Sequence, residues 1–112
     1  MLVDVRTYTA KPGYTPAQVE LYEKHGFPVQ LRHMGQPLCY LQAESGEMNT
    51  FLHLWVYENA ADREQKRANM QKDPDWKVYL DKNREAGNLV AQRTSLMVPA
   101  KFAPLKFDPF KK

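Results

Sequence analysis

The sequence predicts an α+β domain whose elements follow the order β-α-β-β-α-β. Period-two alternation marks the strands, and capping residues with prolines mark the helices between them. The segment at residues 50–58 is the clearest strand. It carries Leu52, Leu54 and Val56 on one face and His53, Trp55 and Tyr57 on the other. A strand that is non-polar on both faces must be covered on both sides, so we place it in the interior of the sheet.

The first strand and the first helical region precede it. Residues 2–9 alternate between two faces and include β-branched side chains, which is typical of a strand. Thr15 followed by Pro16 is typical of an N-cap and a first helical position. Because proline lacks an N–H group and clashes with the preceding turn, we expect the helix to break near Gly26. A second short helix is then expected to start at Pro28.

Turn and capping residues set the boundaries of the remaining elements. Asn59 is a good helix cap with Asp62 three residues on, Asp73-Pro74 is typical of a new helix start, and Gly87 is typical of a helix end. The predicted segments are strands at 38–44, 50–58 and 88–98, and helices at 59–72 and 73–86. This order is that of the ferredoxin-like split βαβ sandwich.

Length and charge predict one small domain with a tail. A chain of 112 residues is one domain by size, which we place at residues 1–99. The net charge of +3 equals the charge of residues 100–112, a basic and aromatic segment that contains Phe102, Phe107 and Phe110. Nucleic-acid binders usually carry a basic face on the folded body, so this distribution argues against nucleic-acid binding.

Cysteine and hydropathy patterns exclude several other classes. With Cys39 alone, an intramolecular disulfide and Cys₄ or Cys₂His₂ zinc sites are impossible. His25 and His33 are eight residues apart, which is not the spacing of a helical metal site, so we expect no metal and no cofactor. The chain shows no signal-peptide run and no membrane span, which predicts a cytoplasmic protein.

The alternation of the strands divides their residues between two faces, of which helices cover only one. We assign the aliphatic set, with Val3, Val5, Thr7, Leu52, Leu54 and Val56, to the helical layer. The opposite face then collects the candidate binding residues Arg6, Tyr8, His53, Trp55 and Arg93, with Tyr57, Tyr40 and Gln42 nearby. An open face this aromatic should not meet water. It therefore packs against a second copy, lines a pocket, or does both when two sheets close into a barrel.

Each candidate also has a purely structural interpretation. His53 is a weak candidate general base, since histidine titrates nearest working pH, but a lone histidine among aromatics is more often a core residue. Arg6 and Arg93 could bind an anion or pair with acidic side chains. Arg63 and Arg67, one turn apart, are typical of a solvated helix face unless they converge on an acid elsewhere.

Several motifs resemble the NIPSNAP family. They are VRTYTAKPG near the N-terminus, YEKHGFPVQLRHMG at residues 22–35, and LHLWVYENAADREQKRANMQKDPDW at residues 52–76. The resemblance covers most of residues 2–99 and implies the dimeric α/β-barrel superfamily, in which two ferredoxin-like sheets close a barrel. That superfamily includes cofactor-free monooxygenases, haem-degrading enzymes and small-molecule isomerases.

Two functional hypotheses follow. The first is a homodimeric NIPSNAP protein that binds a small anionic or aromatic molecule or acts as an interaction protein. The alternative is a cofactor-free monooxygenase or isomerase that acts on a small anionic or phenolic substrate inside the barrel.

Overall fold

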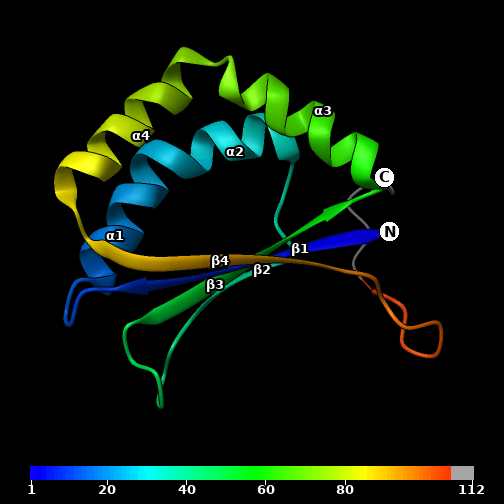
Figure 1. Cartoon of the computed structure of the whole chain (residues 1–112), viewed down its shortest axis with the longest axis horizontal. Helices are drawn as coiled ribbons and strands as arrows, with labels where there is room; N and C mark the ends of the chain where they lie inside the picture. Colours follow the sequence, from blue (N-terminus) through cyan, green and yellow to red (C-terminus); the bar gives the residue numbers. More distant parts are fainter. Residues whose placement is uncertain (107–112) are drawn as a thin grey trace.

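A computed structural model describes residues 1–106 of the chain as a sheet with helices on one face only (Figure 1). The sheet has the order β2-β3-β1-β4, and every neighbouring pair is antiparallel. This is the predicted ferredoxin-like arrangement, in which the first and third strands are neighbours. The strands are β1 (Leu2–Ala10), β2 (Cys39–Gln42), β3 (Thr50–Tyr57) and β4 (Leu89–Met97).

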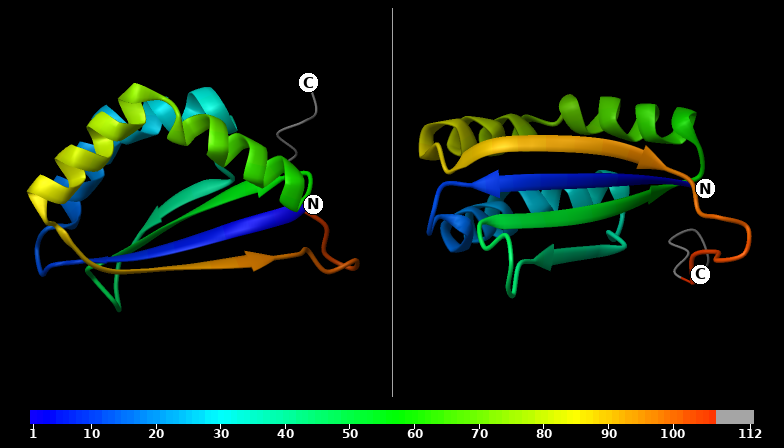
Figure 2. Two further views of the ribbon diagram at one scale, coloured as in Figure 1. Left: turned by 45° about the horizontal axis from the view of Figure 1, so that its top comes forward. Right: turned by 60° about the horizontal axis from the view of Figure 1, so that its bottom comes forward.

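The helices form a single layer on one face of the sheet (Figure 1 and Figure 2). Two crossovers build this layer, one between β1 and β2 and the other between β3 and β4. The helices are α1 (Thr15–Leu21), the π-helical turn η1 (Tyr22–Gly26), α2 (Phe27–Met34), α3 (Ala60–Gln71) and α4 (Pro74–Ala86). None of the helices within residues 1–106 is long and apolar enough to cross a membrane.

The predicted helix break at Gly26 is wrong in form, because the chain stays helical from α1 through η1 into α2. The backbone of Gly26 and Phe27 is right-handed helical, and the Phe27 N–H donates to the carbonyl of Tyr22, five residues back. Pro28 lacks the N–H group that a regular turn would use. One wider π turn accommodates the proline without ending the helix. The helix also begins one residue earlier than expected, since Tyr14 rather than Thr15 is its N-cap.

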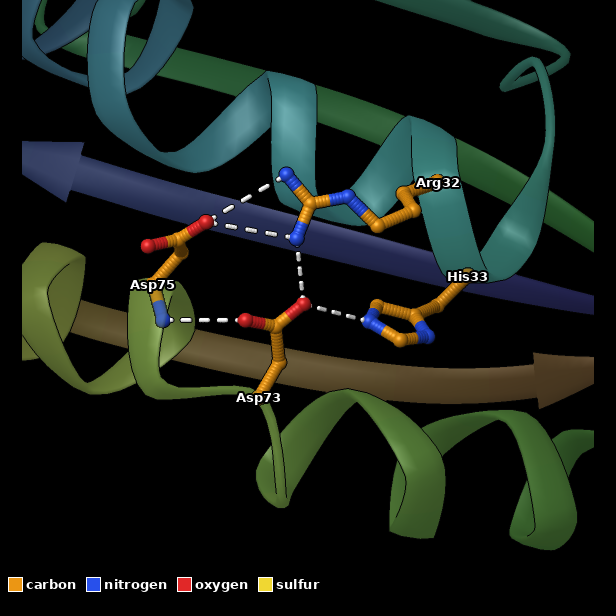
Figure 3. A network of polar contacts seen from close by, with 4 residues as sticks. All are labelled: Arg32, His33, Asp73 and Asp75. Carbon is orange, nitrogen blue, oxygen red and sulfur yellow. Dashed lines mark hydrogen bonds and ion pairs between the residues drawn. The ribbon is translucent and has the colours of Figure 1, made fainter.

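The predicted break between the last two helices is confirmed. Asp73 has extended backbone angles, and its side chain accepts a hydrogen bond from the Asp75 N–H at 2.9 Å. The same carboxylate contacts Arg32 at 2.5 Å and His33 at 2.8 Å, both on α2 (Figure 3). One side chain therefore caps α4 and ties the α3–α4 corner to α2. The predicted cap at Asn59 is likewise confirmed by its bond from the Asp62 N–H.

The core lies between the helices and the aromatic face of the sheet. Trp55 and Tyr57 of β3 are almost fully buried against Val29 and Met34 of α2 and Met70 of α3. The predicted assignment of the two faces is therefore wrong. Aromatic side chains bury more apolar area than aliphatic ones, so the helical layer gains more by covering them. The aliphatic set of β1 and β3 faces the side of the sheet that has no helices.

The described part of the tail makes a turn between Ala100 and Ala103, and Phe102 is 92% exposed. Phe102 therefore does not pack against the rest of residues 1–106. Phe107 and Phe110 lie outside the described residues.

Candidate functional site

A cavity of about 260 Å³ lies between the sheet and the helical layer. The sheet contributes Arg6 and Tyr8 from β1 and His53 from β3, and the helices contribute Tyr22, Arg67 and Tyr79. The register explains why the sheet residues meet, since Arg6 lies directly opposite His53 and Tyr8 lies opposite Phe51. Side chains from distant parts of the sequence therefore line the same cavity.

Stacked aromatic rings make up much of this wall. The His53 ring stacks with Tyr40 at 5.1 Å and with Tyr8 at 5.3 Å between centroids. Tyr8 also stacks with Phe51 at 5.2 Å. Aromatic walls of this kind favour a flat ligand, because ring pairs gain energy beyond the area that they bury.

Tyrosine hydroxyls supply neutral polar groups to the cavity. Burial raises the pKa of Tyr22, Tyr40 and Tyr79 well above the ordinary value. The Tyr22 hydroxyl donates to the side-chain oxygen of Gln30. These phenols stay protonated at any physiological pH, so they act as hydrogen-bonding groups rather than as bases.

Three arginines and one carboxylate set the charge next to the cavity. Asp4 is fully buried, and its Oδ2 lies 2.9 Å from Arg63 Nε and 3.5 Å from Arg6 NH1. The Arg6 Nε–H donates to the Tyr8 hydroxyl oxygen at 3.0 Å. Arg67 has no salt bridge or hydrogen bond within residues 1–106, and burial, Arg6 and Arg63 together lower its pKa. Positive charge therefore exceeds negative charge at this wall.

His53 is held as a neutral imidazole. The indole Nε1–H of Trp55 donates to His53 Nδ1 at 2.5 Å, and the His53 side chain is buried. Burial, together with the charge of Arg6, lowers the pKa of His53 to about 3. Trp55 therefore does not line the cavity, and it acts on the cavity only through its hydrogen bond to His53.

The structure confirms some of the predicted grouping and corrects the rest. Arg6, Tyr8 and His53 do meet, but under the helices instead of on the open face. Arg93 does not join them, since it lies opposite Thr7 on the other face of the sheet and is exposed. A site inside a barrel formed by the open faces of two sheets is therefore wrong for these residues.

Sequence reasoning missed the helical half of the cavity. Tyr22, Tyr79 and Arg67 lie on helices whose facing direction the sequence did not fix. The one available signal was the pair Arg63 and Arg67, which matter if they converge on an acid elsewhere. Arg63 does so, because it binds Asp4 from the first strand.

These features define an α+β domain of ferredoxin-like topology with an aromatic, positively charged cavity between its sheet and its helices. The profile of the NIPSNAP family matches residues 3–104. The chain belongs to the NIPSNAP family.

Relatives of this family support the fold over most of the chain. A NipSnap homolog of Dictyostelium discoideum is 30% identical over 98 residues, which is 88% of this chain and 42% of the relative. The chain thus spans less than half the length of that curated relative. A solved NIPSNAP family protein of unknown function from Agrobacterium tumefaciens is 33% identical with a TM-score of 0.85, and the match covers 94% of this chain and 93% of that one.

More distant structures share the fold alone. A protein from Nitrosomonas europaea, described as a candidate antibiotic biosynthesis monooxygenase, is 13% identical with a TM-score of 0.62. The match covers 88% of this chain and 98% of that chain. The ferredoxin-like topology of the NIPSNAP domain is therefore also found in monooxygenase-type proteins.

Proposed function

We propose that this NIPSNAP domain binds a small aromatic anion, such as a carboxylate or phenolate, in the cavity between the sheet and the helices. The surplus of positive charge at an aromatic wall is the observation that carries this proposal. Asp4 balances one of the three nearby guanidinium groups, and Arg67 is left without a counter-ion within residues 1–106. A half-buried guanidinium gains most from a ligand oxygen, because arginine offers a planar fork suited to carboxylates.

The size of the cavity limits the ligand. A volume of about 260 Å³ lies just below the roughly 300–1,000 Å³ of common small-molecule pockets. A single substituted ring with one anionic group fits this space better than a larger cofactor does. Stacking on Tyr8 and Tyr40 would hold the ring while Arg67 meets the anionic group.

Calorimetry with benzoate and its neutral analogue benzamide tests the proposal. We expect benzoate to bind and benzamide to bind at least about tenfold more weakly, since hydrogen bonds to charged groups are worth about 1.5–3 kcal/mol. Arg67→Gln should weaken benzoate binding by a similar factor. Arg84→Gln is the matched control, because Arg84 is exposed on α4 and, within residues 1–106, its ion pair is with Asp81. Equal binding of benzoate and benzamide would refute the proposal.

A second candidate function uses the same cavity for catalysis. A monooxygenase or isomerase acting on a phenolic or anionic substrate needs groups that stabilise developing negative charge, and Arg6 and Arg67 offer such groups. Incubation with quinol, haem and fatty-aldehyde substrates, followed by both oxygen uptake and product analysis, tests this candidate, because an isomerase consumes no oxygen. Absence of turnover across that panel would leave binding as the function.

Homodimer formation is the remaining part of the proposed function. The face of the sheet without helices carries half-buried Val5, Leu52 and Leu54 and more than half-exposed Leu41. A twofold axis would bring this apolar surface of two copies together, so a second copy is the occupant that we propose. This dimer would leave both ligand cavities on the far sides of the paired sheets.

A further inference from the structure

The hydrogen bond between Trp55 and His53 fixes where the imidazole carries its proton. An indole N–H can only donate, so Nδ1 of His53 must be the acceptor. A neutral imidazole has one protonated and one unprotonated nitrogen. Nε2 therefore bears the hydrogen and is itself a donor.

The remaining donor faces open space. His53 lines the cavity, and Nε2 has no hydrogen-bond partner within residues 1–106. The fully buried side-chain atoms that lack a partner in this part of the chain are Asp4 Oδ1 and Thr15 Oγ1. Nε2 is not among them, so it is reached from the cavity rather than sealed in the core.

This arrangement prevents His53 from acting as a base in the cavity. The single lone pair of the imidazole is occupied by Trp55, and a second proton on Nδ1 would point at the indole N–H. The charge of Arg6, opposite His53 on the neighbouring strand, acts in the same direction. His53 can donate a hydrogen bond from Nε2, and it has no free nitrogen lone pair that could accept a second proton.

We propose that His53 is a specificity-determining residue that donates its Nε2–H to an anionic oxygen of the ligand and does not act as a general base. This inference rests on the proposed binding of an aromatic anion and adds the group that recognises the oxygen. Trp55 is a positioning residue, because it acts only through His53. The cavity then selects ligands by the basicity of their acceptor oxygen.

Nitrogen-15 NMR of the imidazole tests the donor assignment without any ligand. We expect His53 to show an unprotonated Nδ1 and a protonated Nε2 that do not titrate between about pH 5 and 8, the range in which histidine ordinarily changes charge. The spectrum of His53→Gln identifies the resonances. In Trp55→Phe the fixed pattern should give way to a mixture of tautomers or to titration. A proton on Nδ1 of the wild-type protein, or titration in this range, would overturn the inference.

Binding of substituted benzoates of graded basicity tests the recognition itself. In the wild type the affinity should rise with the basicity of the carboxylate, and His53→Leu should flatten this trend and weaken binding by about tenfold or more. His53→Gln retains an N–H donor and should recover part of the trend. A change of packing alone would shift all benzoates equally in both variants, and that result would overturn the inference while leaving the proposed function intact. If no benzoate binds the wild type, the proposed function fails, and a wild-type imidazole that is neutral and Nε2-protonated would still show His53 as a donor.

Discussion

Replacing Asp4 with asparagine is expected to destabilise the domain strongly. The Asp4 side chain is 0% exposed and lies within 4 Å of both Arg63 and Arg6. It joins β1 to α3, so the ion pairs connect the sheet with the helical layer. Asparagine keeps the shape of the side chain and removes its charge, which leaves the guanidinium groups without their shared partner.

The magnitude follows from how deeply each partner is buried. Removing one partner of a buried ion pair costs about 3–5 kcal/mol, because an uncompensated charge remains. The side chains of Arg6 and Arg63 keep 14% and 23% exposure and recover some hydration. We therefore expect the lower end of that range, about 3 kcal/mol. At about 4 °C per kcal/mol for a domain of this size, the Tm should fall by about 12 °C.

Urea unfolding of Asp4→Asn beside the control Asp81→Asn measures this effect. Asp81 also pairs with an arginine, Arg84, but both side chains are well exposed, so its loss should cost about 0.5 kcal/mol or less. Benzoate, which would supply a new negative charge, should restore part of the lost stability of Asp4→Asn through binding. If both variants lose the same small amount of stability, the reasoning about the buried charge is refuted.

Three further perturbations address the helical layer and the open face. Asp73 has its pKa lowered to about 2, chiefly by its hydrogen bond with His33, so its stabilising effect should be complete above the ordinary value of 3.8 and lost as pH falls to about 2. The Tm difference between wild type and Asp73→Asn should shrink over that window, and a difference that grows there would contradict the network. In Gly26→Ala the new Cβ would lie 2.8 Å from Tyr22 Cδ1, and this overpacking, worth about 1–3 kcal/mol, should exceed any gain in helix propensity. A Tm equal to or above that of the wild type would show that the ring moves aside. Leu54→Arg, on the open face, should turn the proposed dimer into a folded monomer by light scattering, and a wild-type mass of about one 13.0 kDa chain would reject the dimer itself.

The elements and their order could be predicted because their signals are local. Alternation marks β1 and β3, Asn59 and Asp73 mark helix starts, and these features depend only on neighbouring residues. The helical path through Pro28 could not be predicted in the same way. Its π turn depends on how the surrounding helices pack around Tyr22 and Gly26, which a rule about a single proline does not include.

The grouping of the sheet residues in the candidate site could be predicted from the sequence, but their position relative to the helices could not. Alternation correctly groups Arg6, Tyr8 and His53 on one face, but it does not say which face the helices cover. From the sequence, we assign the aliphatic set to the helical layer and the candidate binding residues to the opposite face. The helices instead supply the partners: Arg63 pairs with Asp4, and Val29, Met34 and Met70 cover the rings of β3. Burial of polar groups is governed by such partners, which lie 59 residues away in sequence for this pair.

From the sequence, we place the candidate ligand site and the dimer contact on the same face of the sheet, whereas the structure supports placing them on opposite faces. If one face held both the dimer contact and the ligand, any change to one would disturb the other. In the structure, His53 of β3 faces the helices and lines the same cavity as Arg67 of α3, whereas Leu52 and Leu54 lie on the opposite face of the sheet. Period-two alternation places His53 and the two leucines on opposite faces of the same strand, β3. Under the proposed function, substitutions among the cavity residues would therefore alter ligand recognition without touching the proposed dimer contact.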